Sequence, residues 1–338
     1  MNALEALLAE KGTLLADGAT GTNLFDMGLT SGDPPEEWTL THPDRIRTLH
    51  QRFVEAGSDI ILTNTFGANR HRLKLHGMEN RVRELNAAAA RLAREVADAA
   101  PRKVVVGGSV GPTGELFAPL GALTFDEAVD AFAEQVEGLK EGGADVAWIE
   151  TMSAPEEMKA AAEAAHRAGM PFVVTASFDT AGRTMMGLAP EGLGRLSADF
   201  ACEPVAYGSN CGVGASDLLA AILEITEAYP QAVVVAKANC GIPVIRGDEV
   251  VYTGTPELMG DYARLAVDVG ARIIGGCCGT SFTHLAAMRQ ALDTHEKGER
   301  PTVDQIVARL GPLVSPPAAP QPSGEDGESG GRRRRRRG

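Results

Sequence analysis

The chain has 338 residues, of which 44% are hydrophobic and only 5% aromatic, and its formal net charge is −13 at pH 7. Six of its 32 basic residues form the run 332–337, so the rest of the chain carries 26 basic residues against 45 acidic ones. Such an acidic body excludes a general nucleic-acid-binding surface. The sequence has no apolar stretch of membrane-spanning length and does not open on a signal-peptide pattern, and its five cysteines disfavour a disulfide framework. We therefore expect a cytoplasmic protein.

Apolar runs alternate with amphipathic segments along the chain. After a first helix over 3–11, eight short apolar runs predict buried strands: 13–16, 58–62, 103–109, 146–150, 171–177, 204–207, 232–237 and 271–274. A segment with helical spacing of its apolar residues follows each run, and the last one covers 283–292. The runs are continuous rather than alternating, which is typical of parallel strands that are covered on both faces.

Eight strand-then-helix units in about 280 residues indicate a closed (β/α)8 barrel, the TIM-barrel architecture. The alternative is a doubly wound open sheet, which would carry a glycine-rich phosphate loop after its first strand; residues 17–22 match that fingerprint poorly. We expect one barrel domain over 1–312 and a disordered Pro/Gly-rich tail over 313–338. The terminal arginine run is interpreted as part of a solvated tail rather than as a nucleic-acid-binding arm.

Three cysteines follow strands that would end at the same end of such a barrel. Cys277 and Cys278 come directly after the eighth predicted strand, within Gly-Gly-Cys-Cys-Gly-Thr at 275–280, and Cys211 follows the sixth. Active sites of these barrels lie at the carboxyl ends of the strands. Three thiolates suit Zn²⁺ and leave its fourth position open for water or substrate. The competing interpretation of the adjacent pair is two buried small residues or a strained disulfide.

Six motifs together resemble one family, the zinc-dependent homocysteine S-methyltransferases. This family includes betaine–homocysteine methyltransferase and the homocysteine module of cobalamin-dependent methionine synthase. The motifs lie at 17–22, 63–66, 108–112, 150–151, 210–211 and 275–280, so the resemblance spans residues from about 12 to about 295. It implies a methyltransferase that forms methionine when a zinc-bound homocysteine thiolate attacks the methyl group of a donor.

The resemblance also implies roles for individual residues. It makes Cys211, Cys277 and Cys278 the zinc ligands. It assigns the substrate's amino-acid group to Asp17 and Glu150, which would hold the ammonium, to the backbone of Gly18 and Ala19, which would take the carboxylate, and to Asn64. Two carboxylates suit an ammonium group that a dry pocket would otherwise leave uncompensated. From the residues alone, Glu150 is also compatible with an arginine ion pair, and Asp17 with a helix N-cap.

The family divides among betaine, S-methylmethionine and methylcobalamin as methyl donors. Trp38 lies in the region where betaine enzymes carry a tryptophan whose face binds the quaternary ammonium. Gly67 stands where betaine enzymes of animal type have tyrosine, and the Thr-Asn-Thr-Phe form at 63–66 is closer to the methionine synthase module. We expect betaine; a corrinoid donor would need a separate partner protein. The competing class is a non-catalytic zinc- or amino-acid-binding barrel.

The two remaining cysteines are expected to bind no metal. Cys202 falls in a loop, and Cys240, beside Asn239 at the end of the seventh predicted strand, is interpreted as a tolerated small residue close to the site. No histidine is given a role, because attack by a metal-held thiolate removes no proton in that step.

Overall fold

The structure, a computed structural model, describes residues 1–246 and 249–315. Within them, eight parallel strands form one sheet in the order β1-β10-β7-β6-β5-β4-β3-β2. These strands are β1 (Leu14–Leu15), β2 (Ile60–Leu62), β3 (Val105–Val110), β4 (Val146–Met152), β5 (Phe172–Ala176), β6 (Ala206–Cys211), β7 (Val234–Ala238) and β10 (Ile273–Gly276). Neighbours in the sheet follow one another among these strands in the chain, except that the first, β1, pairs with the last, β10.

The sheet closes on itself between β1 and β2. The backbone N–H of Asp59 donates to the Leu15 carbonyl at 2.6 Å, and Ala16 bridges Ile60 in parallel. The strands are buried on both sides: a cluster of fourteen apolar residues, including Trp148 and three leucines of the first helix, fills the interior, and a larger cluster lies between the strands and the helices. Closure and burial on both faces confirm the (β/α)8 barrel.

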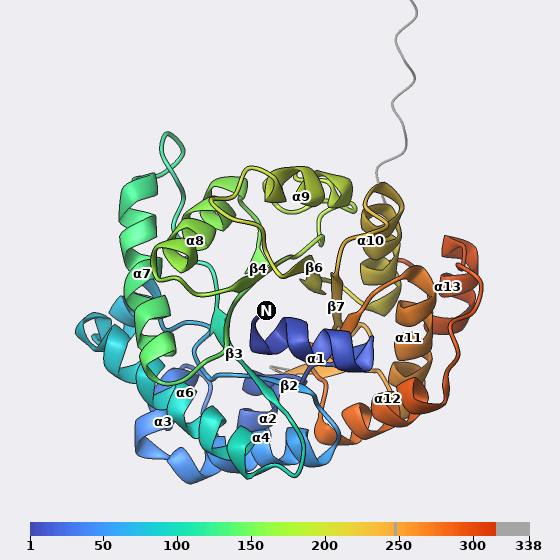
Figure 1. The fold of residues 1–338 in the computed structure, drawn as a ribbon, viewed down its shortest axis with the longest axis horizontal. Coiled ribbons are helices and arrows are strands. Elements are labelled where there is room, and N and C mark those ends of the chain that lie inside the picture. Colours follow the sequence, from blue (N-terminus) through green and yellow to red (C-terminus); the bar gives the residue numbers. More distant parts are fainter. Residues whose placement is uncertain (247–248, 316–338) are drawn as a thin grey trace, which may run out of the picture.

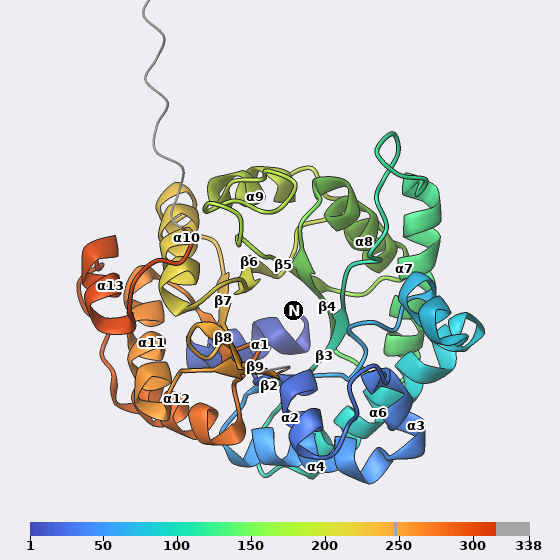
Figure 2. The same ribbon diagram turned by 180° about the vertical axis from the view of Figure 1, so that it is seen from behind.

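Helices surround the barrel, as Figures 1 and 2 show from its two ends. The longer ones are α4 (Pro43–Glu55), α6 (Val82–Ala99), α7 (Phe125–Glu141), α8 (Pro155–Arg167), α9 (Pro190–Ser197), α10 (Ala215–Ala228), α11 (Pro256–Val269), α12 (Phe282–Thr294) and α13 (Val303–Leu310). Three short helices, α2 (Thr20–Asp26), α3 (Trp38–Thr41) and α5 (Arg70–Leu73), belong to the loops that follow β1 and β2. Across the described residues, no helix combines the length and apolarity needed to cross a membrane.

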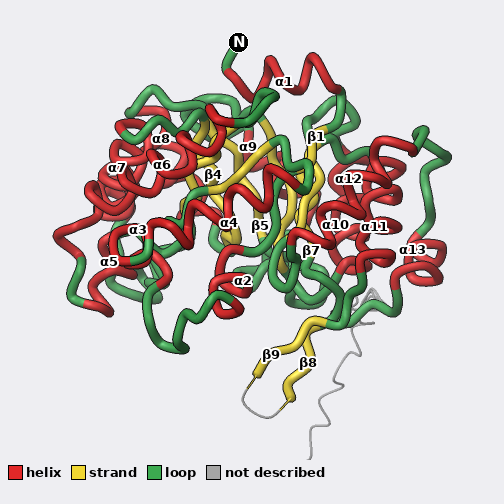
Figure 3. Tube along the Cα trace, turned by 90° about the horizontal axis from the view of Figure 1, so that it is seen from below, coloured by secondary structure: helices red, strands yellow, loops and turns green. Residues whose placement is uncertain are grey.

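The first helix, α1 (Ala3–Lys11), closes one end of the barrel. Asn2 and Glu5 form a capping box that starts it, and its leucines Leu4, Leu7 and Leu8 are buried against the interior residues of the strands. Figure 3 shows α1 across one end and a β-hairpin projecting from the opposite one. We call these the closed end, at the amino ends of the strands, and the open end, at their carboxyl ends.

The sequence analysis missed this hairpin and the helix α13. The hairpin pairs β8 (Pro243–Arg246) with β9 (Glu249–Tyr252) in antiparallel fashion between β7 and α11. Its strands have four residues each and do not belong to the βα repeat that guided the prediction.

The last described residues are attached to the open end. The backbone N–H groups of Val314 and Ser315 donate to the Asp217 carboxylate, and the Ser315 hydroxyl donates to the Asp179 carbonyl at 3.0 Å. Residues 313–315 are thus described at the open end, and the domain boundary expected at residue 312 stays a prediction. The predicted disordered tail otherwise lies outside the described residues.

Candidate metal and substrate site

The structure brings Cys211, Cys277 and Cys278 together at the open end of the barrel. Cys211 is the last residue of β6, and the pair follows β10 directly. One sulfur from each residue lies within 4.8 Å of the other two, and no second group of three or more His, Cys, Asp or Glu donors is this close within the described residues. The thiols interact so strongly that the pKa of Cys211 is raised and that of Cys278 is lowered. Three converging soft donors fit a cation such as Zn²⁺.

Two asparagines fix the segments that carry the three sulfurs. Asn210 accepts from the Thr151 backbone at 2.8 Å and its amide group lies 3.8 Å from the Cys277 sulfur. Asn239 accepts from the Cys278 backbone at 3.0 Å and donates to the Gly212 carbonyl at 2.6 Å. Cys211 itself has φ = 63°, a left-handed conformation that is costly for a residue with a side chain. The backbone is thus held in an unusual shape where the thiols meet.

The hairpin adds an aromatic side chain to this cluster. Tyr252, at the end of β9, packs so closely over Gly279 that a Cβ on this glycine would lie 2.3 Å from the tyrosine ring. Gly279 also has φ = 78°, so both the conformation and the contact require glycine. After the two other cysteines, a hydrogen bond with Tyr252 contributes to the lowered pKa of Cys278. The hairpin therefore places an aromatic side chain beside Cys278.

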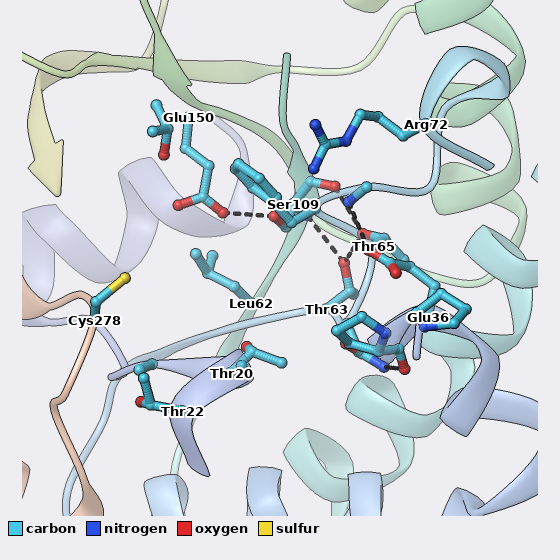
Figure 4. Close-up of a pocket in the computed structure, with 18 of the residues that line it drawn as sticks. Thr20, Thr22, Glu36, Leu62, Thr63, Thr65, Arg72, Ser109, Glu150 and Cys278 are labelled. Atoms are coloured by element: carbon cyan, nitrogen blue, oxygen red, sulfur yellow. Dashed lines mark hydrogen bonds between the residues drawn. The ribbon is translucent and has the colours of Figure 1, made fainter. Parts of the chain in front are cut away.

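A cavity of about 700 Å³ lies beside the thiols. Its inner part is lined by Ser109, Glu150, Lys237 and the three cysteines, and its outer part by residues of the loops after β1 and β2, among them Phe25, Asp33, Glu36, Phe66 and Arg72. Figure 4 shows Glu150, on β4, and Cys278, in the loop after β10, at different parts of the cavity wall. This volume suits a small molecule, and its location is the one that barrel enzymes use for catalysis.

Glu150, at the carboxyl end of β4, is held as a hydrogen-bond acceptor in the inner cavity. The Ser109 hydroxyl donates to one of its oxygens (Figure 4). Ser109 is fixed in turn by Thr63 and Thr65, which bond to its backbone N–H at 2.9 Å and to its carbonyl at 2.7 Å. Burial raises the pKa of Glu150 to about 7, against the opposing effects of Lys237 and the Ser109 hydrogen bond. A bound cation would favour the ionised form of this carboxylate.

Asp17 does not face the cavity. Its side chain is fully buried: one oxygen accepts from the Leu62 backbone at 2.7 Å, and the other accepts from the ammonium of Lys237 at 2.7 Å. Lys237, on β7, lines the cavity, whereas Asp17 does not. Burial raises the pKa of Asp17, and the contact with Lys237 opposes that rise.

The other predicted substrate residues border the cavity. Gly18 and Ala19 lie at its edge, and a Cβ on Gly18 would come within 2.5 Å of the Thr280 carbonyl. The Ala19 N–H already donates to that carbonyl at 3.0 Å. Asn64 lines the cavity too, but its amide group donates to the Pro35 carbonyl at 2.6 Å, so it anchors the loop that precedes α3.

Trp38 lies outside the cavity lining. It is buried at the start of α3, where its ring stacks on His42 with centroids 4.7 Å apart. The guanidinium of Arg45 lies 4.6 Å from the centroid of the same ring. The indole face on which we based the expectation of betaine is therefore covered by this chain's own side chains.

Cys202 and Cys240 do not join the thiol cluster. Cys202 lies at the closed end, in the loop before β6. Cys240 is buried, its backbone N–H donates to the Cys278 carbonyl at 2.9 Å, and it lies against Gly254. It thus supports the loop after β7 without contributing a sulfur to the group of three.

Three residues of the site escaped the sequence analysis: Lys237, Glu36 and Tyr252. Lys237 is the last residue of the predicted strand 232–237, and a lysine at the end of an apolar run is a usable signal of a functional strand end. Glu36 is buried and accepts from the Gly67 N–H at 2.6 Å, and a Cβ at position 67 would lie 2.8 Å from the same oxygen. This contact gives a structural reason for glycine at position 67.

The fold and the site define a class, the (β/α)8 barrels with a three-cysteine cluster beside a small-molecule-sized cavity at the open end. The family model of homocysteine S-methyltransferases matches residues 14–292, and the chain belongs to this family.

Among curated proteins, the chain is 32% identical to the methionine synthase of Mycobacterium leprae over 311 residues and 31% identical to that of Mycobacterium tuberculosis over 306. Each alignment covers 85% of this chain and 25% of the relative, so the chain spans about a quarter of their length. Among solved structures, the metallated form of the homocysteine methyltransferase MmuM from Escherichia coli aligns with a TM-score of 0.73 and 25% identity. That alignment covers 86% of this chain and 99% of MmuM.

Proposed function

We propose that this protein is a zinc-dependent methyltransferase that converts homocysteine into methionine. The observation that carries the proposal is the meeting of three thiols, Cys211, Cys277 and Cys278, at the inner wall of a cavity that also holds the buried Glu150. Membership of the homocysteine S-methyltransferase family supports the same reaction. The three thiols would hold Zn²⁺ as thiolates and leave one position for a ligand. Zinc would keep a substrate thiol deprotonated at neutral pH, where free thiols are mostly protonated.

The chain's own residues would bind and orient the substrate. Glu150 faces the cavity and is positioned by Ser109, so its carboxylate is available to the substrate's ammonium. Tyr252, which packs against Gly279 beside Cys278, would limit the access of water to the reacting sulfur on its side. Transfer of a methyl cation equivalent to a thiolate requires no proton transfer, so the reaction needs no general base.

The donor is a methylated small molecule in this proposal, and betaine is the first choice. Trp38 does not support it, but Phe25 and Phe66 line the outer cavity and are 49% and 37% exposed, so two aromatic faces remain for a quaternary ammonium. The buried carboxylate of Glu36 lies in the same outer part. S-methylmethionine, a sulfonium, would use the same groups; methylcobalamin would require a separate corrinoid protein. Because the thiols must stay reduced, we place the protein in the cytoplasm.

The test is an assay with zinc-loaded protein. Purified protein receives homocysteine with betaine, S-methylmethionine or methylcobalamin in parallel, and methionine is quantified. Methionine from any donor supports the methyltransferase, and its formation from methylcobalamin alone would replace betaine as the donor. Zinc content near one ion per chain combined with no methionine from any donor would instead identify a binding barrel without turnover.

A further inference from the structure

A second cavity, of about 730 Å³, lies on the outer wall of the barrel between α9 and α10. It is lined by the end of α9, the loop that leads into β6, the end of α10 and the loop that leads into β7. Figure 1 shows α9 between α8 and α10 around the barrel. The helix α9 has eight residues, against 13 in α8 and 14 in α10. At about 1.5 Å per residue it is about 8 Å shorter than these two helices, which leaves space beside the start of β6.

Three aromatic side chains line this second cavity: Phe200, Tyr207 and Tyr229. The rings of Tyr207 and Tyr229 meet edge to face, with centroids 6.3 Å apart. The ring of Tyr229 lies directly on α9, where a Cβ at Gly194 would be 2.3 Å from it. Glycine is unfavourable inside a helix, and here it makes room for the tyrosine. Tyr229 therefore reaches from the end of α10 to α9, and its ring forms one wall of the cavity.

The hydroxyl of Tyr207 is a polar group without a partner. The residue is only 8% exposed, yet within the described residues its hydroxyl makes no hydrogen bond. By contrast, the hydroxyl of the buried Tyr262 donates to the Ala236 carbonyl at 2.8 Å. Burial, followed by the effects of Tyr229 and Glu203, raises the pKa of Tyr207 to about 12, so the group stays a neutral hydroxyl. A ligand that bonds to this hydroxyl would satisfy a group that the chain leaves unpaired.

The charge of the cavity lining is negative. Among the described residues that line it, there is no lysine, arginine or histidine, and the one charged side chain is Glu203. Glu203 is exposed and belongs to no ion pair within the part of the chain that the structure describes, whereas Asp199, in the same loop, pairs with Lys159 at 3.2 Å. An anionic ligand would meet an uncompensated carboxylate here. A cation would be attracted by that carboxylate and by the faces of the aromatic rings.

We propose that this cavity is a second binding site, and that its ligand is a small quaternary ammonium alcohol. The aromatic rings would contact the methylated ammonium, Glu203 would supply the counter-charge, and the Tyr207 hydroxyl would bond to the hydroxyl of the ligand. A primary ammonium fits less well, because its three N–H groups would need acceptors inside the cavity. A zwitterion such as betaine would bring a carboxylate toward Glu203. The inference goes beyond the proposed function, since the described residues that line this cavity are all different from those that line the cavity beside the thiols.

The test follows the free thiol of Cys202, which lines the cavity and is partly exposed. Zinc-loaded protein is treated with iodoacetamide, and the modification rate of Cys202 is measured by peptide mass spectrometry, with choline as the probe. We expect saturating choline to slow this modification several-fold, and its concentration dependence gives the affinity at this site alone. The neutral isostere 3,3-dimethylbutan-1-ol has the shape of choline without its charge and should bind about tenfold more weakly.

Three variants separate the contributions to binding, each compared with and without choline so that a changed reactivity of the thiol cancels. Tyr229→Leu removes an aromatic wall and should abolish the protection of Cys202. Glu203→Gln should weaken choline severalfold, whereas Glu296→Gln, a matched loss of an exposed charge outside the lining, should not. Tyr207→Phe should weaken choline and leave tetramethylammonium, which has no hydroxyl, unchanged. The last two lining variants conserve side-chain shape, so they test the site even where Tyr229→Leu fails to fold.

The outcomes decide between this site and its alternatives. Equal protection by choline and by 3,3-dimethylbutan-1-ol would overturn the inference, because it would indicate an apolar cavity without preference for a cation. Absence of protection in the wild type would overturn it as well. Protection that persists in Tyr229→Leu but is lost in Phe66→Leu would place the cation in the cavity beside the thiols instead. None of these results depends on methionine formation, so failure of the proposed function and failure of this inference are observed separately.

Discussion

Both ends of the barrel bury carboxylates, but they compensate them differently. At the closed end, Asp59 is contacted by Lys11 at 2.6 Å, Arg289 at 3.3 Å and Arg102 at 3.7 Å, and it also accepts from the Leu15 N–H. With three cations and a backbone N–H around it, the Asp59 carboxylate is already fully paired and is not available to bind a ligand. That end is therefore built for stability.

At the open end the compensation is incomplete. Within the described residues, Lys237 pairs directly with Asp17, no cation pairs directly with Glu150, and three thiols add potential negative charge beside them. Burial without full pairing raises the pKa of Glu150 to about 7. Buried groups that are left short of partners are the ones that a ligand can satisfy. The contrast between the two ends distinguishes structural from functional carboxylates without reference to any relative.

The largest effect is expected from the thiols. Cys277→Ala should abolish zinc binding and methyl transfer, because two sulfurs cannot replace three, while circular dichroism stays that of a folded barrel. Cys211→Ala and Cys278→Ala should behave alike, and zinc is measured by elemental analysis. Cys202→Ala is the matched control and should keep both properties. Full zinc content in Cys211→Ala together with its loss in Cys240→Ala would show that the ligand set is wrong.

A substitution at the closed end should lower the free energy of unfolding without changing substrate binding. Asp59→Asn leaves Lys11, Arg102 and Arg289 around a neutral amide, and loss of a buried charge partner costs about 3–5 kcal/mol. Denaturant unfolding of the metal-free protein measures this loss of unfolding free energy. Homocysteine affinity of the folded variant should match that of the wild type. A parallel fall in affinity would mean that the two ends are coupled and that the contrast drawn between them fails.

A pH titration separates the two ends further. Because the pKa of Glu150 is raised from 4.5 to about 7, folding disfavours its ionisation. Its contribution to the unfolding free energy of the metal-free protein should thus fall as pH rises from about 4.5 to 7, by up to about 3 kcal/mol, and stay level above that. Glu150→Gln should lack this component of the pH dependence. Identical pH profiles for variant and wild type would refute the raised pKa.

The smallest effect concerns the chain end. Removal of residues 316–338 should leave both activity and unfolding free energy unchanged. Truncation after Leu313 also removes the two backbone donors to Asp217, and should lower the unfolding free energy by about 1–2 kcal/mol while methyl transfer persists. A sharp change in kcat after either truncation would show that the chain end acts on the cavity.

The sequence predicted the repeating strand–helix units and the polar residues at the carboxyl ends of the strands. Eight continuous apolar runs identified the barrel, and the barrel places Cys211 and Cys277 at the same end. It could not predict which polar groups pair with each other. The Lys237–Asp17 contact joins β7 to the end of β1 across the interior, and the sequence separation of 220 residues gives no local pattern.

The same limit explains Trp38 and Tyr252. The tryptophan lies in a non-repetitive loop, where its direction depends on the tertiary contacts with Arg45 and His42. The tyrosine reaches the thiols only because a hairpin outside the βα repeat folds over Gly279. The direction of a side chain in a loop depends on packing rather than on sequence periodicity. The family resemblance therefore indicated where Trp38 lies along the chain but not which way its side chain points.

The attachment of Ser315 has a practical consequence for anyone who fuses or immobilises this protein. The N-terminal residues lead into α1 at the closed end, whereas Ser315 is bonded to the loop after β5 at the open end. A bulky carrier joined at the front of the chain would sit on the side away from the cavity. A carrier joined directly after Ser315 would begin on the side of the entrance, where it would compete for space with an incoming methyl donor.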